Sequence, residues 1–158
     1  MAKGNEIIVS AEPRGVHKEG IISGTPKPGT VMQIKAATEP VNGRHTWEVF
    51  NGAADGERVT VAVLLPDWGL GKIATDAYVT GSRGYLYVPA AGEELNMLVS
   101  NISGTGDSFA IGDTMIVDDT TGKLVATTGT PESEPFEILE TSAALTADTL
   151  LWCMYTGY

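Results

Sequence analysis

Short apolar runs separated by turn residues fill the last third of the chain. The runs are four to eight residues long, and they lie at residues 114–117, 124–128, 135–140 and 148–155. Gly, Asp, Thr and Pro are concentrated in the gaps between them. Short apolar runs bounded by these residues are typical of β-strands joined by tight turns. The pattern therefore predicts antiparallel strands in this part of the chain.

Four further strands are predicted upstream, at residues 31–35, 45–50, 58–65 and 84–89. The run at 58–65 becomes continuously apolar toward its end, which indicates that this end is buried on both faces. In the run at 84–89, Tyr85 and Tyr87 share one face of the strand. Leu86 and Val88 share the other face, because successive side chains of a strand point to opposite sides.

Helices are expected to contribute little. The 19 Gly and 8 Pro residues interrupt the chain too often for long helices. Residues 93–99 fit a helical turn or a strand equally well, and residues 143–147 favour a short helical turn. The predicted fold class is all-β, either a small β-barrel or a sandwich of antiparallel strands, and the sequence leaves these two architectures open.

Residues 1–30 are predicted to form an extended N-terminal arm, and residues 31–158 a single β-rich domain. Several Pro and Gly residues interrupt the first 30 positions, while two short apolar runs lie between them. A poorly ordered tail is the alternative, but apolar side chains are costly to leave in water, which favours docking on a partner. The candidate contact residues of the arm are Lys3, Ile7, Ile8, Val9, Arg14, Lys18, Ile21 and Ile22.

The formal net charge of −10 is unevenly distributed. Residues 1–45 carry six Lys or Arg against four Glu, whereas the remainder carries four basic and sixteen acidic residues. An acidic body repels nucleic acid, so no nucleic-acid partner is expected. No apolar run approaches the roughly 20 residues that span a bilayer, and the N-terminus has no signal-peptide pattern. We therefore expect no membrane partner and synthesis in the cytoplasm.

No motif in the chain indicates catalysis, a cofactor or a metal. His17, His45 and Cys153 lack zinc-ligand spacing, and residues 69–72 lack the spacing of a phosphate-binding loop. The acidic residues at 113–119 do not match a calcium loop. No serine lies in a nucleophile elbow. We expect a protein that is not an enzyme and binds neither cofactor nor metal, with Cys153 a small buried side chain.

Three aromatic residues form a candidate exposed interface: Trp68, Tyr85 and Tyr87. Trp68 follows Pro66 and Asp67 in a predicted loop, so it is the tryptophan expected to be most exposed. Trp47 and Trp152 lie in strand patterns, which favours the core for both. Exposed aromatic side chains are enriched at protein interfaces, and they also suit sugar stacking.

The order of features from residue 59 to the end resembles the head decoration proteins, or capsid cement proteins, of tailed bacteriophages. In that family an apolar strand like residues 59–65 precedes a Gly-containing loop. A later hairpin of the form Gly-Asp-x-apolar, then Asp-x-x-Gly-Lys-apolar-Val, is matched by residues 111–118 and 121–125. Strands like residues 136–140 and 148–155 follow. The resemblance covers about two thirds of the chain.

The resemblance implies a structural virion protein on the outer surface of the phage head, assembled in the host cytoplasm. It implies the major capsid protein and two further copies of the chain, as a homotrimer, as partners. Binding across shell junctions would stabilise the head against internal DNA pressure. The alternatives are another phage structural component, a tail tube or head fibre subunit, or a carbohydrate-binding β-sandwich.

The arm interpretation makes two expectations testable. Deletion of residues 1–24 is expected to leave a folded domain that no longer binds heads. Alanine at Ile21 and Ile22 is expected to weaken attachment with little change in the melting temperature.

Overall fold

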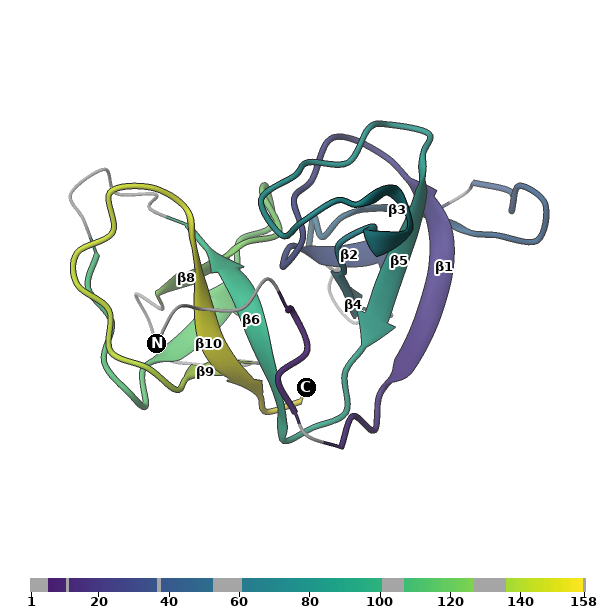
Figure 1. The fold of residues 1–158 in the computed structure, drawn as a ribbon. Helices are drawn as coiled ribbons and strands as arrows, with labels where there is room; N and C mark the ends of the chain where they lie inside the picture. Colours follow the sequence, from purple (N-terminus) through teal and green to yellow (C-terminus); the bar gives the residue numbers. More distant parts are fainter. Residues whose placement is uncertain are drawn as a thin grey trace.

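The strands close into two barrels in the computed structural model, which describes residues 6–10, 12–36, 38–52, 61–100, 107–126 and 136–157 (Figure 1). Around the first barrel the order is β1 (Val16–Ile22), β3 (Thr46–Val49), β2 (Val31–Ile34), β4 (Val61–Leu64) and β5 (Arg83–Val88). Around the second it is β10 (Thr149–Tyr155), β6 (Glu93–Val99), β8 (Leu124–Ala126), β7 (Thr114–Val117) and β9 (Phe136–Ile138).

Most neighbouring strands are antiparallel, which confirms the predicted all-β fold class. The pairs β1–β3 and β6–β8 are parallel. Residues 93–99, for which helix and strand were equally favoured, form strand β6. The helical turn predicted at residues 143–147 is wrong, because this segment contains no helix. A 3-10 turn, η1 (Trp68–Leu70), is the helical element of the described residues.

The interior of the first barrel is filled by alternate residues of its strands. Met32 of β2, Leu64 of β4 and Leu86 of β5 are fully buried in one apolar cluster, together with Trp47 and Ile22. The alternation of strand side chains directs the intervening residues to the outer face.

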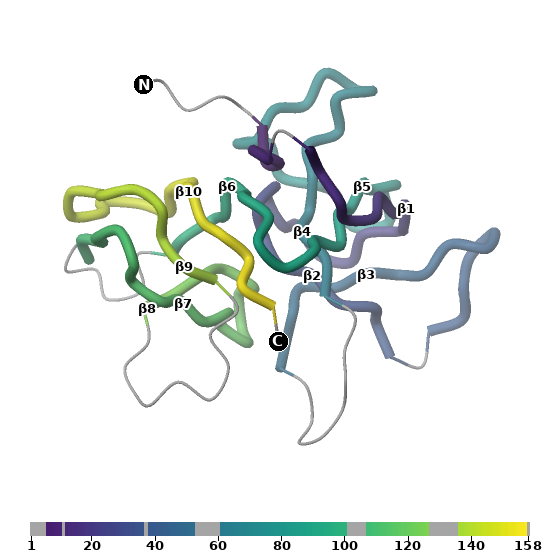
Figure 2. The backbone as a smooth tube through the Cα atoms, turned by 90° about the horizontal axis from the view of Figure 1, so that it is seen from below, coloured from purple at the N-terminus to yellow at the C-terminus, as the bar shows by residue number. Residues whose placement is uncertain are grey.

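Part of the outer face of the first barrel is buried as well, against the second barrel. Val31, Val63 and Tyr87 belong to a larger cluster that also contains Met97 and Leu151 of the second barrel. The predicted burial of both faces at the end of residues 58–65 is therefore confirmed. The two barrels lie side by side (Figure 2) and share this larger cluster, which we call the shared core.

Backbone contacts between the barrels are close at two glycines. The Leu98 N–H donates to the Gly29 carbonyl at 3.0 Å, and the Val31 N–H donates to the Gly122 carbonyl at 2.8 Å. Both glycines have positive φ, 83° at Gly29 and 64° at Gly122. A Cβ atom at Gly122 would lie 2.5 Å from the Val31 carbonyl oxygen. Glycine is required here by backbone conformation and by space.

The interpretation of residues 1–30 as an arm separate from the domain does not hold for the described residues. Strand β1 pairs with β5 from Val16 to Ile21 and closes the first barrel. Residues 6–10 lie along β6 (Figure 1), where the Asn96 N–H donates to the Ile7 carbonyl at 2.7 Å. The first four residues of β1 are exposed, so this segment lacks the apolar alternation that would predict a strand.

The burial of Ile22 reverses the expected effect of its substitution. Ile22→Ala should lower the free energy of unfolding by about 2–5 kcal/mol, because it leaves a cavity in the first barrel. Ile21→Ala, on the adjacent half-buried position, is the matched control and should cost less. Urea unfolding of both variants measures the difference. Equal small losses would contradict this placement of Ile22.

The contact at Gly122 can be tested separately from backbone strain. Gly43 has a similar φ of 75°, but no atom lies within 4 Å of a Cβ built there. We expect Gly43→Ala to cost about 1 kcal/mol, the strain of the left-handed conformation. Gly122→Ala should cost about 3 kcal/mol or more, because it also forces the barrels apart. Thermal unfolding measures both, and equal losses would exclude a close contact at Gly122.

Candidate functional site

The connection between β4 and β5, residues 65–82, concentrates exposed apolar side chains. Nine large apolar side chains are exposed among the described residues, and four of these lie on this connection: Trp68, Leu70, Ile73 and Val79. The connection is drawn in teal along the top of the first barrel in Figure 1. Exposed apolar side chains that gather on one segment are typical of an interaction surface, and the β4–β5 connection is therefore the candidate functional site.

Hydrogen bonds hold the start of this connection in one conformation. The Asp67 side chain caps η1 by accepting from the Leu70 N–H at 3.3 Å. Gly71 ends the turn in the left-handed conformation, and its N–H donates to the Trp68 carbonyl at 3.0 Å. These contacts fix the backbone that carries the exposed Trp68 and Leu70 side chains.

Tyr78 anchors the second half of the connection to the barrel. Its hydroxyl donates to the Leu65 carbonyl at 2.8 Å, and its N–H donates to the Pro26 carbonyl at 2.9 Å. Burial raises the pKa of Tyr78 to about 12, so the hydroxyl remains a donor throughout the physiological range. Thr80 adds a side-chain bond to the Gly24 carbonyl at 2.9 Å.

A small pocket opens between the two halves of the connection. Its lining combines apolar residues with two acidic residues, one lysine and two residues that carry hydroxyl groups, and it consists of Asp67, Leu70, Lys72, Asp76, Ala77, Tyr78, Val79 and Ser82. Leu70 and Val79, the two most exposed apolar side chains of the connection, both line it. Such a pocket suits an apolar side chain of a partner.

The structure separates the three aromatic residues predicted to form an exposed interface. Trp68 is exposed, as predicted. Tyr85 is half-buried, with the Arg83 guanidinium 5.5 Å from its ring centroid. Tyr87 is fully buried, so its predicted exposure was wrong. The reason is that its strand face turns toward the second barrel. Leu70, Ile73 and Val79 were missed because no alternation singles them out.

The candidate contact residues of the predicted arm fall into three groups. Ile7 and Ile22 are fully buried, and Ile8 and Ile21 are half-buried. The buried pair cannot act as accessible anchors in the folded chain, because each already packs in an apolar cluster. The exposed group is Val9, Arg14 and Lys18, and Lys3 lies outside the described residues.

A buried carboxylate ties residues 14 and 15 to the connection between the barrels. Glu93 accepts from the Tyr87 hydroxyl at 2.6 Å, from the Ala90 N–H at 2.6 Å and from the Gly15 N–H at 3.1 Å. The Arg14 N–H donates to the same carboxylate. Burial alone would raise the pKa of Glu93, but these hydrogen bonds outweigh it and lower the pKa.

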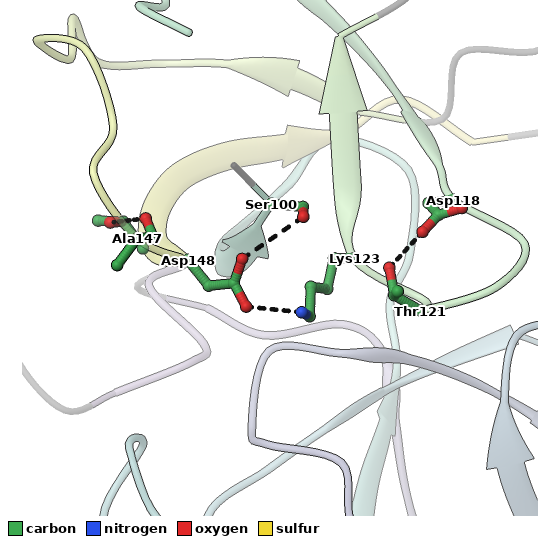
Figure 3. Close-up of polar contacts among 7 residues, drawn as sticks. Ser100, Asp118, Thr121, Lys123, Ala147 and Asp148 are labelled. Carbon is green, nitrogen blue, oxygen red and sulfur yellow. Dashed lines mark hydrogen bonds and ion pairs between the residues drawn. The ribbon is translucent and has the colours of Figure 1, made fainter. Parts of the chain in front are cut away.

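A second polar cluster joins three elements of the second barrel (Figure 3). The Lys123 ammonium donates to Asp148 at 2.6 Å, and the Ser100 hydroxyl donates to the other carboxylate oxygen at 3.4 Å. Asp148 thus lies between Lys123 and Ser100, so the lysine is not placed as a base for the serine. This arrangement ties the end of β6 and the β7–β8 turn to the start of β10.

The net charge differs between the parts of the chain that form the two barrels. Residues 91–158 carry eleven acidic residues and one basic residue, whereas residues 1–90 carry nine of each. The second barrel therefore belongs to the acidic part of the chain, and the candidate site lies in the balanced part. Among the residues that the structure describes, no three His, Cys, Asp or Glu side chains gather to hold a metal ion. None of the described residues belongs to a helix long and apolar enough to cross a bilayer.

Comparison with known proteins finds a likeness of fold. No family model matches the chain, and no curated protein matches its sequence. Among solved structures, the chain is similar to the N base of head fibre gp8.5 of bacteriophage phi29. The TM-score is 0.52 at 11% identity, and the likeness covers 89% of this chain and 93% of the other. The likeness therefore spans both barrels.

The Glu93 network predicts a specific acid sensitivity. A carboxyl group whose pKa is lowered by folding contributes stability that is present above its unfolded value and is lost as the pH falls below about 4.5. Glu93→Gln should lower the free energy of unfolding by about 1–3 kcal/mol at pH 7. The difference in free energy of unfolding between the variant and the parent should become smaller at acid pH. Urea unfolding at several pH values measures this difference.

The control for this prediction is Glu94→Gln. Glu94 is the half-buried neighbour on the same strand. Its backbone, rather than its side chain, bonds to Val9 and Ser10. A pH-independent loss for Glu93→Gln, or an equal loss for Glu94→Gln, would contradict the assigned role of Glu93.

Proposed function

We propose that this chain is a structural protein of a bacteriophage head, bound to the outer surface of the shell. One observation carries the proposal: the fold likeness to the phi29 head fibre base extends over 89% of this chain and 93% of that one. The sequence resemblance to head decoration proteins points independently to the same location. Two arguments of different kinds, one from sequence and one from fold, therefore support attachment to a phage head.

Two roles on the head are compatible with this fold. As a decoration protein, the chain would bind across shell junctions, and its binding free energy would favour the closed shell. As a head fibre base, it would anchor a further structure without bracing the shell. Both roles need a stable module with a docking surface, and neither needs bond-breaking chemistry.

The proposed partners are the major capsid protein and further copies of the chain. A homotrimer would present three contact sets to the shell at high effective concentration, which raises the overall affinity without any new contact. Val9, Arg14 and Lys18 remain as shell-contact candidates because they are exposed. Ile7 and Ile22 no longer serve as candidates, because both are buried in the folded chain.

Cryo-electron microscopy of heads from the phage that encodes this chain tests the proposal. Heads that lack the protein, mixed with the purified chain, should gain density on the outer surface. Density repeated between capsomers, with a higher temperature of head disruption, indicates the decoration role. Density at the base of a projecting fibre, with an unchanged disruption temperature, indicates the fibre role. Heads without added density would contradict both.

A further inference from the structure

The exposed apolar residues of the β4–β5 connection cover a substantial area. The exposed fractions are 55% for Trp68, 76% for Leu70, 42% for Ile73 and 67% for Val79. For side chains of these sizes this amounts to roughly 500 Å², which lies near the upper end for a monomer. A stable interface buries about 800 Å² on each partner. These four side chains and their polar neighbours therefore approach the area that a stable dimer needs.

The connection is ordered before any partner binds. The cap at Asp67, the left-handed Gly71 and the Tyr78 anchor fix the backbone that carries the apolar side chains. Association at such a surface avoids the entropy cost of ordering a loop.

The charges of the connection are balanced and of both signs. Lys72 is exposed and Asp76 is half-buried, whereas Asp67 is buried and the adjacent Arg83 is already paired with Glu19. Where connections of two copies meet, Lys72 of one copy can pair with the Asp76 carboxylate of another.

The rest of the molecule restricts where two copies can meet. Residues 91–158 have a net charge of −10, so contacts between two second barrels are opposed by like-charge repulsion. The β4–β5 connection lies on the first barrel, where the charges balance. We propose that the β4–β5 connection is the surface through which copies of this chain bind each other. This inference does not depend on the proposed function.

Sedimentation equilibrium of the full chain tests the inference. The mass should rise with concentration from 16.6 kDa to at least twice that value. Association should be tighter at high salt than at low salt, because salt screens the repulsion between the acidic second barrels. A chain that stays monomeric at all concentrations and at both salt levels overturns the inference.

Substitutions locate the interface. Leu70→Asp and Val79→Asp should each weaken association by about 100-fold, because a charge would be buried at the centre of the contact. Ile111→Asp is the matched control, since Ile111 is 66% exposed on the second barrel, and it should associate like the parent. All three should keep the parental melting temperature. If the Leu70→Asp variant associates as strongly as the parent chain, the contact lies elsewhere and the inference is overturned.

Binding to heads distinguishes this inference from the proposed function. A parent chain that binds heads but remains monomeric overturns self-association and leaves the head role intact. If Leu70→Asp then abolishes head binding, a shell protein covers the connection instead. A parent chain that self-associates through Leu70 but does not bind heads supports the inference and contradicts the proposed function.

Discussion

The close backbone contact between the two barrels is the constraint on which the rest of the structure depends. At Gly29 and Gly122 the backbones of the two barrels approach so closely that a Cβ atom on either glycine would clash with a backbone atom of the other barrel. This approach lets Val31, Val63 and Tyr87 on the outside of the first barrel enter the shared core. Two small barrels, each of marginal size for an independent core, thereby become one larger buried unit.

Tyr87 links this packing to the polar network around Glu93. Its ring is buried in the shared core, while its hydroxyl donates to the Glu93 carboxylate. Burying a carboxylate is costly unless several hydrogen bonds replace water, and Glu93, the first residue of β6, receives its donors from Arg14, Gly15, Tyr87 and Ala90. The hydrogen bonds to this one carboxylate therefore hold residues 14 and 15, the β5–β6 connection and the start of β6 together.

Local pattern predicted most strands because one face of each is apolar. The run ending at Leu65 even indicated burial on two faces, which the shared core explains. Strand β1 was not predicted, because Val16 and the three residues after it are exposed and are held mainly by pairing with β5. At the candidate site, Trp68 was predicted from its loop position. Leu70 and Val79 were not, because their exposure depends on how the whole connection folds against the barrel.

The segregation of charge gives the molecule a large electric dipole along the line that joins the barrels. In the field of a uniformly acidic surface such a molecule rotates before it touches, since the torque acts over a Debye length of about 8 Å at physiological salt. The first barrel, whose charges balance, then faces the surface, and the acidic second barrel points away from it. Contact with such a surface is therefore less unfavourable through the first barrel than through the second.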